Sequence, residues 1–176
     1  MKGMFRITCV VALLLALAGV AVAAELQVGS EAPNFTLSNQ EGKQISLNNL
    51  RGKWVVLYFY PKDFTQGCTI EARGFQRDQA EYLARNAEVL GVSLDSADSH
   101  KKFCEAEGLT FTLLADPTRE VAEKYNSLNV ARGVAQRNTF VIDPKGKVAK
   151  VFLGVNPNKH SEEVIAMLEE VGAKKK

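Results

Sequence analysis

Histidine, cysteine and tryptophan are scarce in this 176-residue chain, which has two histidines, three cysteines and one tryptophan. The histidines, His100 and His160, stand far apart without ligand partners at metal spacing, so each is expected at the surface or in helix packing. No Walker-type or dinucleotide-binding glycine pattern occurs. We therefore expect neither a bound metal nor an organic cofactor.

A long apolar run occurs only at the N-terminus, where 18 residues extend from Ile7 through Ala24. Two basic residues precede the run, and "AVA" at 21–23 has the A-x-A form of a secretory cleavage site. We expect residues 1–24 to be a signal peptide and residues 25–176 to form one domain, secreted across the inner membrane into the periplasm. Because the run reaches the lower length limit of a membrane span, an uncleaved N-terminal anchor is the alternative.

Neither sign of charge is in clear excess. The chain has 22 Lys and Arg against 20 Asp and Glu, and removal of the leader with its two basic residues leaves 20 of each. A balanced surface gives no electrostatic case for a nucleic-acid partner. No membrane partner is expected once the leader is cleaved.

Apolar patterning in the rest of the chain predicts alternating strands and helices. Hairpins are expected at 32–47 and 139–154, and buried strands at 54–60 and 88–94. Helices are expected at 67–83 with Gly74 as a weak point, at 96–107, at 117–126 with proline in the first turn, and at 161–172 with Ser161 as the cap. The expected fold is α/β: a thioredoxin-like sandwich, with a mixed central sheet flanked by helices and an N-terminal β-hairpin extension.

Cys68 directly follows a predicted buried strand and opens the next helix. Open α/β sheets place their sites at the carboxyl ends of strands, and a helix N-terminus favours the thiolate through free N–H donors and a positive field. Thr65 can reach the sulfur or an incoming oxygen, and Pro61 can shield the sulfur from water. The alternatives are an inert buried cysteine or a structural Cys68–Cys104 disulfide.

Pro61, Thr65 and Cys68 stand in a P-x-x-x-T-x-x-C arrangement within "VVLYFYPKDFTQGCTIEA". With "VGSEAPNFTL", "VLGVSLDSADSHKKF", "LADPTREVAEKY" and "RNTFVIDPKGKV", this segment resembles the peroxiredoxins of the AhpC/TSA family. The resemblance covers most of the chain and is greatest to the peroxiredoxin Q branch, also called bacterioferritin comigratory protein. The combination of motifs is highly specific.

Three positions depart from that branch. Gln66 and Thr112 stand where proline is common. Arg73 occupies the place, five residues after Cys68, where many members carry a resolving cysteine.

The resemblance implies a thiol peroxidase that reduces hydrogen peroxide and organic hydroperoxides. The Cys68 thiolate would attack a peroxide oxygen and become a sulfenic acid. The Thr65 hydroxyl and the N–H groups near Gly67 would face the leaving oxygen. Arg137, which opens "RNTFVID", matches the family's arginine and is expected beside the sulfur, oriented by Glu71; a solvated arginine is the alternative.

The resemblance also implies that Cys104, 36 residues after Cys68, is the resolving cysteine, recycled by a thioredoxin-like reductant. Two alternatives stay open: a one-cysteine peroxiredoxin in which Cys104 only packs, and an extracytoplasmic thiol–disulfide exchange protein. The second normally uses a C-x-x-C pair, which the chain lacks. No cysteine follows Cys104, so the C-terminal cysteine arm of dimeric relatives is missing and a monomer is expected.

Overall fold

The computed structural model describes residues 26–173. The predicted leader, residues 1–24, lies outside these residues. Within residues 26–173, no helix has the length and apolar character needed to cross a membrane.

A seven-stranded mixed sheet forms the centre of the molecule, in the order β2-β1-β5-β4-β3-β8-β9. Strands β3, β4 and β5 run parallel, whereas β1 pairs antiparallel with β5 and β8 pairs antiparallel with β3. The strands are β1 (Thr36–Asn39), β2 (Gln44–Ser46), β3 (Trp54–Phe59), β4 (Ala87–Ser93), β5 (Thr112–Ala115), β8 (Thr139–Ile142) and β9 (Val148–Phe152).

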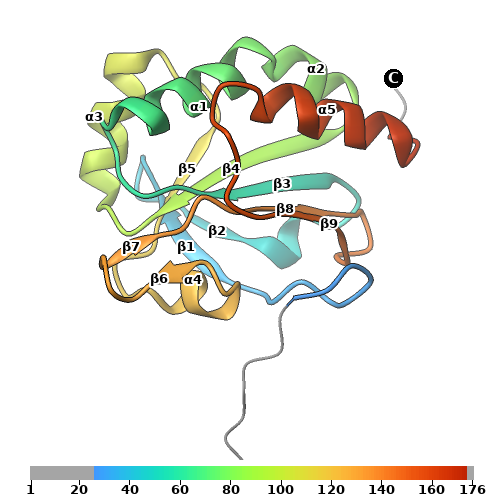
Figure 1. Ribbon diagram of the computed structural model, residues 1–176, viewed down its shortest axis with the longest axis horizontal. Coiled ribbons are helices and arrows are strands. Elements are labelled where there is room, and N and C mark those ends of the chain that lie inside the picture. The colour runs from blue at the N-terminus through green and yellow to red at the C-terminus, as the bar shows by residue number, and fades with distance from the viewer. Residues whose placement is uncertain (1–25, 174–176) are drawn as a thin grey trace, which may run out of the picture.

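Helices cover both faces of this sheet (Figure 1). One face carries α1 (Gln66–Arg77), α2 (Gln79–Ala84), α3 (Ala97–Glu107) and α5 (His160–Glu170). The other face carries the short 3-10 helix η1 (Leu47–Leu50), α4 (Glu120–Lys124) and the small hairpin of β6 (Leu128–Asn129) and β7 (Val134–Ala135). This layered arrangement is the thioredoxin-like sandwich that the sequence predicts.

The central strand β3 explains why both faces are covered. Its side chains alternate between two cores: Val56 and Tyr58 face α1 and α5, whereas Val55 and Leu57 face α4. A strand that is apolar on both faces must be covered on both. Cys68 and Cys104 both belong to the core on the α1, α3 and α5 side.

Both predicted hairpins, both predicted strands and the helix at 96–107 are confirmed, and Ser96 caps α3 by accepting from the Ser99 N–H at 3.2 Å. The hairpin expected as an extension joins the sheet through β1 and β5. Strand β5 and the small β6–β7 hairpin were not predicted.

The predicted helix at 67–83 is in fact two helices, and the break lies at Asp78 rather than at Gly74. After this break α2 turns so that Tyr82 packs on Phe75 and donates from its hydroxyl to the carbonyl of Ser161 at 2.8 Å. The prediction that Ser161 caps α5 is wrong, because Ser161 is the second helical residue and is buried against Tyr82.

Helix α4 is shorter than predicted, and Pro117 lies in the turn before it. The Asp116 carboxylate accepts hydrogen bonds from the N–H groups of Val121 at 3.1 Å and Ala122 at 2.8 Å. These bonds start the helix after Arg119, whose backbone is left-handed, with φ of 68°.

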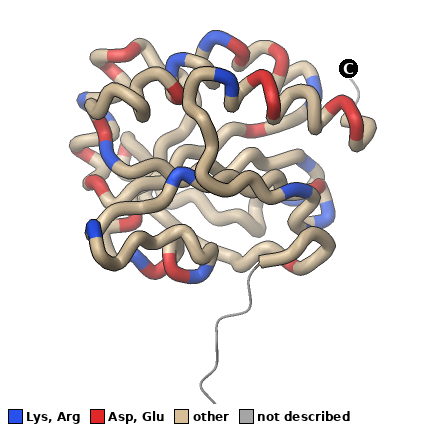
Figure 2. The backbone as a smooth tube through the Cα atoms, in the orientation of Figure 1, with Lys and Arg blue, Asp and Glu red and all other residues tan. Residues whose placement is uncertain are grey.

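Basic and acidic residues are interspersed along the helices, with no extended area of one sign in the view of Figure 2. This distribution agrees with the balanced composition of the sequence.

Candidate active site

Cys68 lies past the carboxyl end of β3, as the third residue of α1. Its side chain is 1% exposed and the thiol is free. Thr65 is the N-cap residue, with extended backbone, so the first-turn N–H groups have no partner within the helix. These donors and the helix dipole stabilise negative charge at the position of the sulfur.

Arg137 reaches the same sulfur from the segment just before β8. Its Nη2 lies 3.4 Å from Cys68 Sγ, and its Nη1 forms an ion pair with Glu71 Oε2, one turn further along α1. The expected contact between Arg137 and Glu71 is therefore present. One guanidinium bridges the thiol and the buried carboxylate, which holds the cation in a single place.

Burial governs the charges of this pair. It raises the pKa of Glu71 to about 7, although the nearby charge and hydrogen bond of Arg137 oppose the rise. Burial lowers the pKa of Arg137, but the charges of Glu71 and Cys68 outweigh it and raise that pKa above its ordinary value. Arg137 therefore stays charged beside the sulfur.

Gly67 makes room for this arrangement, and the sequence alone did not reveal this role. A Cβ at Gly67 would lie 3.1 Å from Arg137 Nη2 and 3.8 Å from Pro157 Cγ. Any side chain here would push on the guanidinium that contacts Cys68. A glycine directly before a cysteine at a helix start is the signal that could have suggested it.

Thr65 and Pro61 surround the start of the helix. The Thr65 hydroxyl donates to the carbonyl of Lys62 at 2.9 Å, and the side chain is exposed at the surface. Pro61 is half-buried and follows Tyr60, whose N–H continues the β3 ladder to Val92 at 3.0 Å. Because the Thr65 hydroxyl donates its hydrogen to the Lys62 carbonyl, its oxygen remains free to accept a hydrogen bond.

Cys104 lies on α3 and, like Cys68, is a free, buried thiol. Burial raises its pKa to about 12, and the charge of Asp63 adds to this effect. His100, Phe103 and Cys104 form the buried face of α3, and Cys104 is 8% exposed.

The two histidines do not lie at the surface, so of the two expectations the one that they pack within the fold is confirmed. Both are fully buried. His100 contacts Asp63, whereas His160 places Nε2 2.7 Å from the Thr139 hydroxyl. In the part of the chain that is described, no group of three or more His, Cys, Asp or Glu side chains could hold a metal ion.

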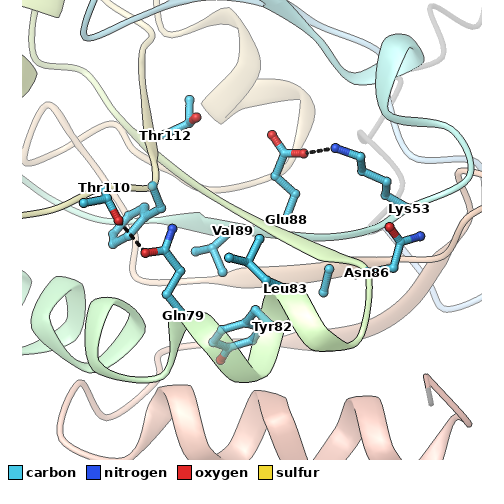
Figure 3. A pocket seen from close by; sticks show the side chains of 11 residues that line it. Lys53, Gln79, Tyr82, Leu83, Asn86, Glu88, Val89, Thr110 and Thr112 are labelled. Atoms are coloured by element: carbon cyan, nitrogen blue, oxygen red, sulfur yellow. Dashed lines mark hydrogen bonds and ion pairs between the residues drawn. The ribbon is translucent and has the colours of Figure 1, made fainter. Parts of the chain in front are cut away.

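Cys68 is not among the residues that line a pocket of about 310 Å³ (Figure 3). Lys53, Asn86 and Thr112 mark its position at the amino ends of β3, β4 and β5. Sites in open α/β sheets form at the opposite, carboxyl ends. The pocket contains none of the predicted site residues.

A thioredoxin-like sandwich with a cysteine beside an arginine at a strand-to-helix junction is the arrangement expected of a thiol peroxidase, and comparison with known proteins agrees. The family model "AhpC/TSA family" matches residues 28–151. The chain therefore belongs to the AhpC/TSA family, and it is a peroxiredoxin with peroxidase activity.

Its relatives include members of the peroxiredoxin Q and Bcp branch. The chain is 40% identical to peroxiredoxin Q, chloroplastic, of Triticum aestivum over 150 residues, covering 84% of this chain and 69% of the relative. It is 34% identical to peroxiredoxin Bcp of Bacillus subtilis over 155 residues, covering 85% and 99%. The crystal structure of peroxidoxin BcpB from Mycobacterium tuberculosis superposes with a TM-score of 0.78 at 30% identity, covering 84% and 99%.

Proposed function

We propose that Cys68 is the peroxidatic cysteine of a two-step peroxidase in which Cys104 resolves the oxidised sulfur. The observation that carries the first step is the 3.4 Å contact between Arg137 Nη2 and Cys68 Sγ at the start of α1. A cation and a helix N-terminus aimed at one buried sulfur stabilise the thiolate, which is the nucleophile.

In the first step the Cys68 thiolate attacks one peroxide oxygen, and the O–O bond breaks. Cys68 becomes a sulfenic acid, and the other oxygen leaves as water or an alcohol after taking up a proton. Arg137 and the first-turn N–H groups stabilise the charge that develops on the leaving oxygen. Thr65 orients the peroxide by accepting a hydrogen bond from its O–H group, because its own hydrogen is bound to Lys62.

In the second step the Cys104 sulfur attacks the sulfenic sulfur of Cys68. The S–S bond forms, the S–O bond breaks, and the hydroxyl leaves as water with the proton from Cys104. Two solved structures of Xanthomonas campestris peroxiredoxin Q carry cysteine-to-serine substitutions at positions 36 residues apart. Cys68 and Cys104 are also 36 residues apart, which supports this pairing.

We infer that the second step requires movement, because the two free thiols belong to different helices of the folded protein. A disulfide needs Cα atoms within about 7 Å and Cβ atoms facing one another. The first turn of α1 and part of α3 therefore unwind when the disulfide forms. The burial that raises the pKa of Cys104 to about 12 is relieved by the same movement.

The remaining assignments follow from the chemistry and the sequence. Hydrogen peroxide and organic hydroperoxides are the substrates, and a solved structure of the Xanthomonas campestris bacterioferritin comigratory protein is described in terms of alkyl peroxide reduction. A thioredoxin-like reductant reopens the disulfide. The leader-like run at 1–24 supports export to the periplasm, and a monomer remains a prediction.

The Cys104→Ser variant tests the two-step scheme. We expect it to keep the first peroxide step, to lose sustained turnover with a thioredoxin-like reductant, and to accumulate sulfinic Cys68 under excess peroxide. Cys68→Ser is the matched control and should not react. Normal turnover of Cys104→Ser, with no Cys68–Cys104 disulfide in the peptide map of oxidised wild type, would show a one-cysteine enzyme.

A further inference from the structure

A buried carboxylate ties the segment before α1 to helix α3. Asp63, between β3 and α1, is 3% exposed. Its carboxylate accepts hydrogen bonds from the Ser99 hydroxyl at 2.6 Å and the Tyr60 hydroxyl at 2.7 Å. His100 places Nδ1 2.9 Å from the same carboxylate, and the Asp63 N–H donates to Asp95 at 3.0 Å.

The charge of Asp63 is retained in this buried place. Burial raises the pKa of Asp63, but the hydrogen bond and charge of His100 and the hydrogen bonds from Ser99 and Tyr60 lower it below its ordinary range. His100 also places Nε2 3.1 Å from the carbonyl of Leu114 in β5. The contacts of Asp63 thus reach α3 directly and β5 through His100.

The next residue strengthens the same junction. Phe64 adopts φ of 60°, a left-handed conformation that is strained for an aromatic residue. Its ring packs edge-on against Phe103 of α3, with ring centroids 5.1 Å apart. Strain of this kind persists only where surrounding contacts hold it, and the contact with Phe103 is one that does so.

These contacts join the two elements that carry the reacting sulfurs. Cys104 lies four residues after His100 on the same face of α3, and Cys68 lies five residues after Asp63. The disulfide step needs α3 and the start of α1 to unwind, so it needs the bonds of Asp63 to α3 to break.

We propose that Asp63 is a positioning residue for the second step: its bonds to Ser99 and His100 latch α3 to the start of α1 and limit the rate at which Cys104 reaches oxidised Cys68. The latch keeps the site intact for attack on peroxide. It also lengthens the life of the sulfenic acid, during which a second peroxide can convert Cys68 to the sulfinic acid. The inference rests on the proposed role of Cys104.

The test compares Ser99→Ala with Tyr125→Phe in single-turnover experiments with hydrogen peroxide. Ser99→Ala removes one hydrogen-bond donor to Asp63. Because alanine forms helices more readily than serine, a weaker helix cannot explain faster opening of α3 in this variant. Tyr125→Phe removes one partly buried hydrogen bond, to the carbonyl of Pro33 at 2.8 Å, from a residue of the core on the other face of the sheet. Peroxide consumption, disulfide formation and sulfinic acid are followed by rapid quench and mass spectrometry.

We expect Ser99→Ala to consume peroxide at the wild-type rate and to form the disulfide about ten-fold faster, the scale expected for losing one hydrogen bond to a charged group. Less sulfinic acid should accumulate. Asp63→Asn should change the disulfide rate in the same direction, and Tyr125→Phe should lower the unfolding midpoint but leave the disulfide rate unchanged.

The outcomes separate this inference from the function on which it rests. A wild-type disulfide rate in Ser99→Ala and Asp63→Asn overturns the latch and leaves Cys104 as the resolving cysteine. Equal acceleration in Tyr125→Phe also overturns it, because general destabilisation would then explain the effect. If oxidised wild type contains no Cys68–Cys104 disulfide, both the latch and the proposed role of Cys104 are wrong.

Discussion

Replacing Arg137 with methionine tests the role of the cation that contacts the Cys68 sulfur. At 3.4 Å and an effective dielectric constant of about 20, two unit charges attract by about 5 kcal/mol, an upper bound because 17% of the Arg137 side chain is exposed. Loss of one preorganised donor typically costs about 3–4 kcal/mol in the transition state. We therefore expect the peroxide step of Arg137→Met to slow by about 10²–10³-fold.

The same substitution should change stability little at pH 7, because Glu71 can take up a proton. In the folded protein the pKa of Glu71 is already raised from 4.5 to about 7, so the carboxyl is near half-protonated at that pH. When Arg137 is removed, complete protonation of Glu71 therefore lowers the free energy of unfolding by less than about 1 kcal/mol. A large loss of activity with a small loss of stability is the expected signature.

Above pH 7 the variant should become progressively less stable than the wild type. Without Arg137, the folded-state pKa of Glu71 rises further, so the folded variant holds a proton that the unfolded chain releases. Because the pKa of this acid is higher in the folded than in the unfolded state, the free energy of unfolding falls as pH rises. The fall is about 1.4 kcal/mol per pH unit for as long as Glu71 stays protonated in the folded variant. Adding Glu71→Gln should remove this pH dependence without restoring the peroxide step.

Stopped-flow peroxide consumption and urea unfolding at pH 7 and 8.5 check both parts. The reasoning is refuted if Arg137→Met reacts with peroxide within a few-fold of wild type. It is equally refuted if Glu71→Gln in the double variant restores the rate, because the arginine would then act only by neutralising the carboxylate.

Three further predictions concern residues around this site. Gly67→Ala places a Cβ 3.1 Å from Arg137 Nη2 and should slow peroxide consumption about ten-fold by displacing the donor; an unchanged rate would show that the guanidinium moves without consequence. Thr65→Val should slow the peroxide step while Thr65→Ser preserves most of it, since only the hydroxyl is needed; equal rates would remove Thr65 from the mechanism. Burial, with the charge of Arg137, lowers the pKa of His160 to about 4, so lowering the pH from 6.5 to 4 should cost about 3 kcal/mol of stability. Urea unfolding of His160→Gln should lack this loss, and an equal loss in that variant would contradict the assignment.

Local sequence was sufficient for most of the elements near Cys68. The run at 54–60 is apolar at every position, and a strand of this kind needs cover on both faces, as β3 has. Ser96 and Gly108 mark the two ends of α3, and both act as its caps. Elements with weaker local signals were missed: β5 is four residues long, and the break at Asp78 has no glycine or proline to announce it.

The candidate site, too, was predicted from the sequence only in part. The motif around Cys68 and the arginine of "RNTFVID" were identifiable as residues, and the structure places Arg137 against the sulfur. The roles of Gly67 and Asp63 were not predicted, because they depend on contacts with side chains from other parts of the chain. Gly67 needs the guanidinium of a residue 70 positions away, and Asp63 needs the donors of α3.

The sequence by itself determined the layered α/β architecture and the position of Cys68 at the start of a helix, because periodicity and helix-end chemistry act over a few residues. The resemblance to the peroxiredoxins pointed to Arg137 as the cation beside the sulfur. The tertiary structure alone decided which atoms meet. Pairing of β3 with β8 brings Arg137 to Cys68 and Glu71, and packing of α3 against the segment after β3 buries His100 on Asp63. Such contacts depend on strand register and helix packing across the whole domain, because side chains distant in sequence acquire a shared, dry environment only when the sheet has formed.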